Sequence, residues 1–188
     1  MTKGLVLLFA VSFIIFTGLD ALTTWVAIHW HGFKEINIFT DTSSMSAILL
    51  PEIVILSIGI VAVLVGALWK RNDMRMSIDR GFRPFYQSFW ISRRLLASAL
   101  IYLPISLALV RVLPVLSNSC YLLIGWSPIR VLHPLSEMLG WSLFRTVLLL
   151  HGIIGGALVV PITYVIYRVC RYGQQAAAVG PLTRPTGL

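Results

Sequence analysis

Four long apolar stretches dominate the pattern of hydrophobic and polar positions along this chain, and most of the charged residues lie between or beyond them. A helix of about 20 residues crosses a hydrocarbon core of about 30 Å, and each stretch is long enough to do so. The pattern therefore predicts an all-helical, polytopic membrane protein with four transmembrane helices. The expected spans cover residues 4–28, 46–69, 95–116 and 142–167.

The composition supports this assignment. Of the 188 residues, 57% are hydrophobic and only 12% are charged, whereas soluble domains carry about 25% charged residues. We expect one transmembrane domain over residues 1–172. The remaining segment, 173–188, is rich in Gly, Pro and small residues and is expected to be a disordered cytoplasmic tail.

The positive charges predict the orientation. The chain has a net charge of +8, and eleven of its 15 Lys and Arg residues lie before the first span, between the second and third, or after the fourth. Cytoplasmic loops carry such an excess, so we expect both termini and the 70–94 loop inside, in a multi-pass protein of the cell inner membrane. The six tryptophans all lie near expected span ends, where their rings favour the headgroup boundary.

The inner loop 70–94 combines arginines with aromatic residues. The aromatics at 82, 85, 86, 89 and 90 follow helical spacing, which predicts an amphipathic helix lying on the inner leaflet, with rings in the acyl boundary and arginines at anionic lipid headgroups. Nucleic acid is not expected, because these aromatics directly precede a span and stacking would need them exposed. The expected lipid- or partner-facing residues are Arg80, Arg83, Phe85, Phe89, Trp90, Arg93 and Arg94.

Other features concern helix packing. Gly152 and Gly156 form a G-x-x-x-G pair that favours close helix contact, within the bundle or with a partner. Pro104 and Pro161 each remove a backbone donor inside an expected span, which predicts a kink at each. The apolar outer loop 117–141 is expected to fold back on the outer interface.

Ionisable residues occur inside the expected spans. Asp20, Glu52 and His151 all lie about 9 to 13 Å from the outer ends of their helices, and an ionisable group at that depth turns inward and finds partners because isolation in lipid is costly. Thr24 shares a helical face with Asp20. We therefore expect a buried polar cluster in the outer half of the bilayer, made of Asp20, Thr24, Glu52, Arg111, Arg145 and His151.

Two interpretations of this cluster remain open at this point. In one, it locks the bundle, with Asp20 or Glu52 paired to Arg111, Arg145 or His151. In the other, it passes a proton or cation. The outer loops add N and O groups that could ligate zinc or copper, namely His29, His31, Glu35, Asp41, His133 and Glu137. Their spacing matches no known metal motif, so any metal or other cofactor stays unknown. The outer-loop polar residues expected to matter most are His29, His31, Glu35 and Asn37.

The spacing Asp20, three residues, Thr24, ten residues, Glu35, one residue, Asn37 resembles the signature of a family of small bacterial integral-membrane proteins that carry a domain of unknown function. The resemblance covers about residues 5–70 and implies a membrane fold without implying an activity. A weaker likeness, over "KRNDMR" and "IYLPISLAL", is to membrane proteins of integrating conjugative elements.

These observations favour a non-enzymatic accessory or assembly subunit of a larger inner-membrane complex, with other membrane subunits as partners. No G-x-S-x-G or S-x-x-K nucleophile motif is present. The alternative is a small proton or cation carrier or channel that uses Asp20, Glu52 and His151. A metal-dependent membrane enzyme, or a part of a conjugation or secretion apparatus, is a third possibility.

Overall fold

The computed structural model describes residues 1–31 and 44–178, and all regular elements within these ranges are helical. In chain order they are α1 (Thr2–His31), α2 (Met45–Trp69), α3 (Arg71–Ile78), α4 (Phe82–Trp90), α5 (Leu95–Val110), α6 (Val112–Ile124), the 3₁₀ helix η1 (Pro128–Leu132), α7 (His133–Leu139), α8 (Leu143–Ala157) and α9 (Val159–Ala178).

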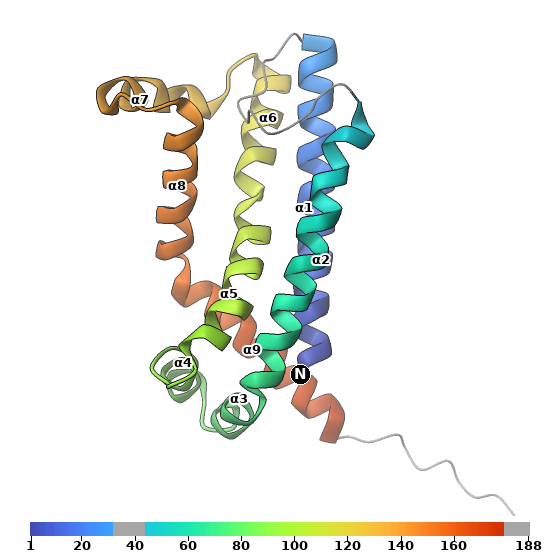
Figure 1. Ribbon diagram of the computed structural model, residues 1–188, viewed down its shortest axis with the longest axis vertical. Coiled ribbons are helices and arrows are strands. Elements are labelled where there is room, and N and C mark those ends of the chain that lie inside the picture. The colour runs from blue at the N-terminus through green and yellow to red at the C-terminus, as the bar shows by residue number, and fades with distance from the viewer. Residues whose placement is uncertain (32–43, 179–188) are drawn as a thin grey trace, which may run out of the picture.

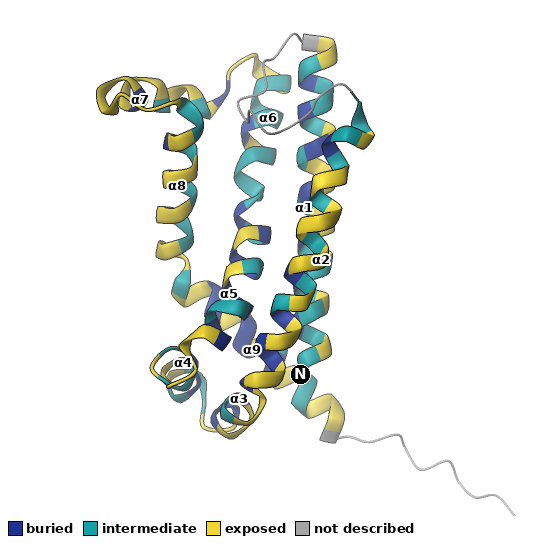
Figure 2. Cartoon of the chain, in the orientation of Figure 1, coloured by how far each residue is buried: buried dark blue, intermediate teal, exposed yellow. Residues whose placement is uncertain are grey.

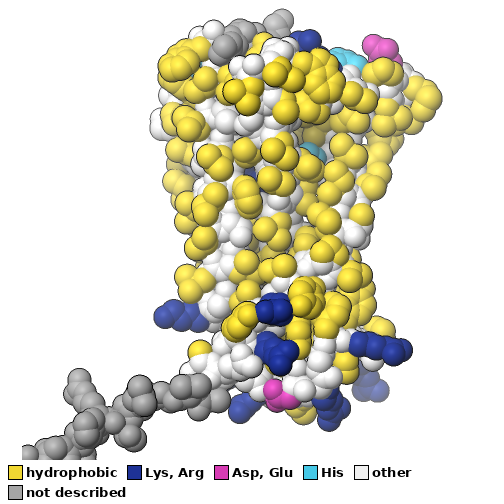
Figure 3. Space-filling view, turned by 180° about the vertical axis from the view of Figure 1, so that it is seen from behind, with side chains coloured by type: hydrophobic (Ala, Val, Ile, Leu, Met, Phe, Trp, Pro, Cys, Tyr) yellow, Lys and Arg dark blue, Asp and Glu magenta, His cyan; other side chains and the backbone are white. Residues whose placement is uncertain are grey.

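Three long helical segments stand side by side as the upright part of the molecule (Figure 1). They are Thr2–Trp30, Met45–Trp69 and Leu95–Ile124, and each is long and apolar enough to cross a membrane. Their outer faces leave many large apolar side chains exposed, and Figure 3 shows hydrophobic groups covering the middle of the molecule. Soluble proteins rarely expose apolar surface on this scale. The prediction of an all-helical protein is therefore confirmed over the described residues, and three of its helical segments are candidate membrane spans.

The fourth expected span, 142–167, is not one helix. It is divided into α8 and α9, with a break at Leu158. Pro161 accounts for the break, because it has no N–H to donate to the carbonyl of Ala157 and its ring crowds that carbonyl. Below the break, α9 runs obliquely under the upright helices (Figure 1). The α8 helix instead forms a bent pair with η1 and α7, at 109°, and only if this pair is counted as one span does the described chain reach four.

A second proline break lies within the third span. Here α5 ends at Val110, four residues before Pro114, and α6 begins at Val112. Pro114 has no N–H to donate to the carbonyl of Val110, so the same loss of a backbone donor interrupts the helix. The helix α5 continues through Pro104, where a kink was expected. Helical structure also extends to Ile124, beyond the expected end of the span at residue 116.

Glycines allow α2 to approach its two neighbours closely. A Cβ built on Gly59 would lie 2.2 Å from the ring of Phe9 on α1, and one built on Gly66 would lie 2.6 Å from the carbonyl oxygen of Ala97 on α5. Small residues at helix crossings permit such contact between backbones in membranes. The position of α2 against both α1 and α5 therefore depends on these two glycines.

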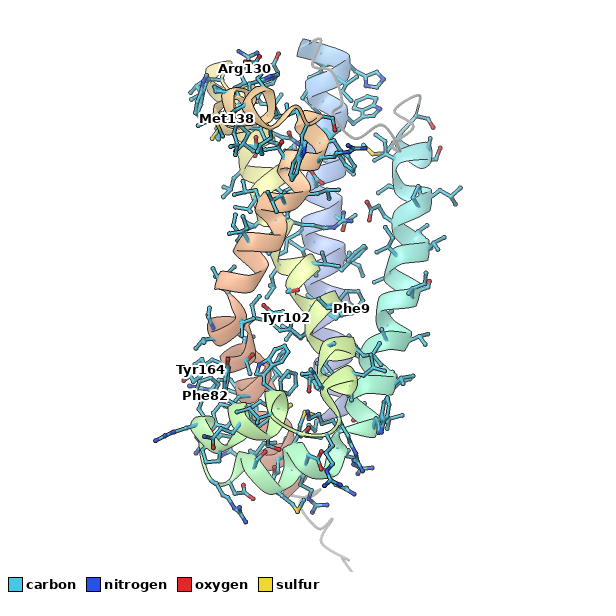
Figure 4. The ribbon with its side chains drawn as sticks, turned by 60° about the vertical axis from the view of Figure 1, so that its left-hand side comes forward. Phe9, Phe82, Tyr102, Arg130, Met138 and Tyr164 are labelled. Carbon is cyan, nitrogen blue, oxygen red and sulfur yellow. The ribbon has the colours of Figure 1, made fainter. Side chains whose placement is uncertain are left out.

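At the end of the molecule that holds the N-terminus, called the inner end after the expected orientation, α3 and α4 form a short helical hairpin that packs on α9 (Figure 1). Phe85 and Phe89 of α4 are fully buried, and the ring of Phe82 makes an edge contact with Tyr164 of α9, with centroids 5.2 Å apart (Figure 4). The helical spacing of the aromatics is thus realised in α4. The expectation that Phe85 and Phe89 face lipid or a partner is wrong, because α9 and α5 cover this face with protein.

At the other end, η1 and α7 lie across the top of α8 (Figure 1). Val131, Leu135, Met138 and Leu139 are exposed there and recur at helical spacing, so they form one apolar face. The structure thus has an exposed apolar segment at this end, as expected for an outer loop that lies on the interface.

The expected tail begins later than residue 173. Residues 173–178 belong to α9, which ends at Ala178. The expectation of disorder for residues 179–188 lies outside the described residues.

Candidate functional site

The first polar contact of the bundle joins α1 to α6. The side-chain amide of Asn118 donates to Asp20 Oδ1 at 3.2 Å and to Thr24 Oγ1 at 2.8 Å. Thr24 is buried and Asp20 is half-buried. An amide carries two N–H donors, and the two short contacts use both. Asn118 therefore satisfies polar groups on two successive turns of α1 and fixes α6 against it.

The second polar contact joins α2 to the break between α5 and α6. Arg111 Nη2 donates to Glu52 Oε2 at 2.7 Å, with side chains 21% and 23% exposed. The Arg111 guanidinium also lies over the ring of Phe13 of α1, 4.8 Å from its centroid. One cation thus links three helices by a charge-assisted hydrogen bond and a cation–π contact.

Thr17 lies on the face of α1 between these two contacts, one turn after Phe13 and one turn before Asp20. It is 5% exposed, and its hydroxyl oxygen has no hydrogen-bond partner among the described residues. A buried hydroxyl without a partner costs about 1 to 3 kcal/mol. Most polar side chains on the α1 face from Phe13 to Thr24 therefore have hydrogen-bond partners among the described residues, and the Thr17 hydroxyl is the exception on this face.

The remaining members of the expected cluster lie elsewhere. His151 of α8 places its Nδ1 2.8 Å from the carbonyl oxygen of Val147, one turn back on its own helix. Arg145 is exposed at the start of α8. The structure therefore pairs Glu52 with Arg111 and brings Asp20 and Thr24 together through Asn118, while His151 is satisfied within α8.

Among the residues proposed as metal ligands, the structure describes the side chains of His29, His133 and Glu137, and the last two are exposed on α7. The His29 ring stacks on Trp25 with centroids 4.5 Å apart, and its Nδ1 lies 3.0 Å from the Trp25 carbonyl oxygen. The side chain of His31, and all of Glu35, Asn37 and Asp41, lie outside the described residues. Within the part of the chain that is described, no three His, Cys, Asp or Glu side chains are grouped as a metal site would need.

A buried lysine forms the most extensive polar contact at the inner end. Lys70 directly follows α2, and its side chain is 0% exposed. Its Nζ donates to Phe89 O, to Ser92 Oγ at 2.8 Å and to Ser98 Oγ at 2.5 Å. The ammonium also lies 3.4 Å from the carbonyl oxygen of Arg94. Lys70 thus donates hydrogen bonds to carbonyl and hydroxyl oxygens at the end of α4, in the α4–α5 turn and at the start of α5.

The surroundings of Lys70 shift its protonation equilibrium. Burial lowers the pKa of Lys70 from its usual 10.5 to about 8, with the carboxylate of Asp73 raising it and the guanidinium of Arg94 lowering it. Desolvation disfavours the charged form of an amine, so the direction follows from the 0% exposure. The ammonium also lies 5.4 Å from the centroid of the Phe89 ring.

Sequence reasoning missed both Asn118 and Lys70 as contact residues. Asn118 lies in a segment assigned to the outer loop, and Lys70 belongs to a basic run interpreted as lipid-facing. The sequence offers one signal for Lys70. It lies at the end of a helix that contains glycines, and Ser92 and Ser98 lie near the start of the next expected span.

The arginines of the inner end are exposed, in contrast to Lys70. Arg80, Arg83, Arg93 and Arg94 all have exposed side chains, and Figure 3 shows Lys and Arg gathered at this end of the molecule. Trp90, expected to face lipid or a partner with them, is half-buried and donates through Nε1 to Thr163 Oγ1 at 3.0 Å. Arginines therefore supply the exposed positive charges of the α3–α5 segment, while Phe85, Phe89 and Trp90 are buried or half-buried beneath them.

Fold and polar contacts together define a helical protein with three to four candidate membrane-spanning helices and interhelical polar contacts at both ends. Comparisons of the chain with protein-family models, with curated proteins and with solved structures give no match.

Proposed function

We propose that this chain is a non-enzymatic assembly subunit of a larger inner-membrane complex, with four membrane crossings and both termini in the cytoplasm. The exposed apolar surface of the long helices and the exposed arginines at the end that holds the N-terminus support this orientation (Figures 1 and 3). In this topology α8 and the first turns of α9 make the fourth crossing, because the 15 residues of α8 extend only about 22 Å.

The observation that carries the proposal is the open face of α8. A Cβ built on Gly152, Gly155 or Gly156 would meet nothing within 4 Å. Figure 2 shows α8 largely exposed, and Ile153 beside these glycines is 60% exposed. The α8 helix is held to α5 by the hydrogen bond that Tyr102 Oη donates to the Gly155 carbonyl oxygen, at 2.5 Å. No described residue thus packs against the G-x-x-x-G pair.

The occupant that we propose for this face is a transmembrane helix of a different subunit, with small residues at the contact and acidic residues at its cytoplasmic end. Small residues allow the backbone approach that drives helix association in lipid. The charge requirement comes from the exposed Arg83 and Arg93 of the inner end and from Arg168 of α9, which follows α8. A second copy of this chain would bring like charges together there, whereas an acidic segment would complement them.

The test is the size and composition of the particle that contains this chain when it is extracted from its own membrane with styrene–maleic acid. We expect a hetero-oligomeric particle, and we expect Gly152→Leu to release this chain as a single subunit. Gly18→Leu is the matched control, because a Cβ at Gly18 of α1 also meets nothing within 4 Å and both replacements add the same side chain to an open helix face.

Three results would overturn the proposal. The wild-type chain could run as a lone subunit in the extracted particle. Two differently tagged copies could co-purify, which would identify a second copy as the occupant. Gly152→Leu and Gly18→Leu could also behave alike, which would separate assembly from the α8 face.

The carrier hypothesis has less support from the geometry. It needs Asp20, Glu52 and His151 to share one path, but Glu52 is paired with Arg111 and His151 is bonded within α8. These contacts suit the interpretation in which buried polar groups lock the bundle. A metal-dependent enzyme or a conjugation component likewise stays a prediction from the sequence.

A further inference from the structure

A small polar hollow lies at the inner end, between the α3–α4 turn and α9. Its volume is about 260 Å³, and its lining includes Asp79, Arg80 and Gly81 from the turn and Tyr167, Arg171 and Gln175 from α9. The hollow is therefore built by two segments that are far apart in the sequence and are brought together only by the fold.

The two arginines of the hollow keep most of their hydrogen-bonding capacity. Each guanidinium has five N–H donors, and neither Arg80 nor Arg171 forms an ion pair with an acid among the described residues. Arg171 spends one donor on Tyr167 Oη at 3.2 Å. Both side chains are exposed at the mouth of the hollow, so they can turn toward a ligand without breaking an internal salt bridge.

The acid in the lining is already engaged. Gln174 Nε2 donates to both carboxylate oxygens of Asp79, at 3.3 and 3.1 Å. This contact ties the α3–α4 turn to α9 and holds the carboxylate on the α9 side. The hollow thus combines two positive charges with one negative charge that has its own partner, and its net charge is positive.

A helix start adds further donors. The nine residues of α4 begin after Gly81, whose φ is 102°; no side chain caps the N–H groups of Phe82 and Arg83, and Pro84 has no N–H. Unpaired N–H groups at a helix N-terminus favour an anion. Together with two guanidiniums they match a phosphate group, which accepts several charge-assisted hydrogen bonds at once.

We propose that this hollow binds the phosphate group of an anionic phospholipid of the inner leaflet. The source of the phosphate rests on the membrane placement proposed above, which puts the exposed arginines of this end at headgroup depth. A phosphomonoester such as phosphatidic acid binds more tightly than a phosphodiester, because it carries more charge. The apolar tails remain outside the hollow, along the exposed surface of α9 that includes Val165 and Tyr172.

The experiment measures lipid retained by the purified full chain in native mass spectrometry, after exchange into mild detergent with phosphatidic acid, with phosphatidylcholine, or with inorganic phosphate as competitor. We expect retention of phosphatidic acid over phosphatidylcholine. We expect Arg80→Gln with Arg171→Gln to weaken retention by about tenfold or more, since the double variant loses the charge-assisted hydrogen bonds to the phosphate.

The matched control is Arg75→Gln with Arg93→Gln, which removes the same charge from exposed positions of the same end that do not line the hollow. Equal loss in both double variants would overturn the proposal, because it would reduce the effect to overall charge. Binding of inorganic phosphate without retention of any lipid would also overturn it. Thermal unfolding of each variant shows whether the fold is kept. If the Gln double variant does not fold, Arg80→Lys with Arg171→Lys keeps the charge and is tested in its place. The particle size measured for Gly152→Leu reports separately on assembly.

Discussion

Replacement of Lys70 by Met isolates the contribution of the buried ammonium. Methionine keeps an unbranched stem of similar length beside Phe89, so packing changes little. The variant loses the donors to Phe89 O, Ser92 Oγ and Ser98 Oγ. Because these acceptors come from three consecutive segments, their loss is expected to loosen the α4–α5 junction where it meets the end of α2.

The expected cost follows from what remains unsatisfied. Ser98 Oγ still donates to Phe89 O after the change, so that carbonyl keeps one partner. Ser98 Oγ loses its ammonium donor, whereas Ser92 Oγ still accepts from the backbone N–H of Arg94 at 3.2 Å. An unmet buried acceptor costs about 1 to 3 kcal/mol, and part of this cost is offset because the desolvation cost of the buried charge also disappears. We expect a loss of about 1 to 3 kcal/mol in the free energy of unfolding at neutral pH.

Two measurements report this loss. The first is the thermal or denaturant midpoint in mild detergent. The second is the alkylation rate of Cys170, which is fully buried at the same end, in a background where Cys120 is replaced by Ala. Loosening of the inner end should raise this rate severalfold. Arg75→Met is the control, since it removes an exposed charge from the same end.

The stability of the wild-type protein relative to Lys70→Met is expected to depend on pH. The pKa of Lys70 is lowered from 10.5 to about 8 in the fold, so between these values the unfolded chain binds more protons than the folded one, and stability rises with pH. The Lys70→Met variant lacks this term. The stability difference between the two proteins should therefore widen between pH 7.5 and 9.5, and a difference that narrows would refute the reasoning.

Three further predictions concern the bundle. Glu52→Gln should cost about 1 to 3 kcal/mol in detergent unfolding, and Arg111→Met in the same chain should recover part of it, since the cost is that of a half-buried unpaired cation; additive losses would contradict this. Gly66→Val should lower the thermal midpoint by the equivalent of about 1 to 3 kcal/mol because its Cβ meets the backbone of α5, whereas Gly18→Val should have little effect. Asn118→Leu should cost about 1 to 3 kcal/mol by removing the amide that donates to Thr24 Oγ1 and Asp20 Oδ1, and an unchanged midpoint would argue against that contact.

The sequence was sufficient to predict the helical, apolar character of the protein, because a span needs only length and hydrophobicity. It was insufficient to predict where a proline interrupts a helix, because the proline affects the carbonyl four residues before it. The breaks before Pro114 and Pro161 depend on which carbonyl loses its donor and on whether packing tolerates the bend. Pro104 lies inside an unbroken helix, so the residue type alone does not decide the outcome.

The inner loop shows a different limit. The spacing of its aromatic residues correctly indicated a helix, but helical spacing describes one apolar face without identifying what covers it. In the structure, α9 covers Phe85 and Phe89, and residues far along the chain supply that cover. A lipid leaflet and a protein surface impose the same periodicity.

The polar contacts could be predicted only by type. The cost of an ionisable group in an apolar span indicates that Glu52 must have a partner, and Arg111 was one of the residues considered. The choice of Asn118 for Asp20 and Thr24, and of carbonyl and hydroxyl oxygens for Lys70, depends on helix register and crossing geometry. A single sequence does not contain that information directly.

The contact between Gly59 and Phe9 has an evolutionary consequence. A methyl group at position 59 would overlap the Phe9 ring, so neither residue can enlarge alone without moving α1 away from α2. The two positions should therefore change together among homologues, with Ala or Ser at 59 accompanied by a smaller side chain than Phe at 9. An inherited size correlation of this kind would identify true descendants of this bundle even where the rest of the lipid-facing sequence has drifted.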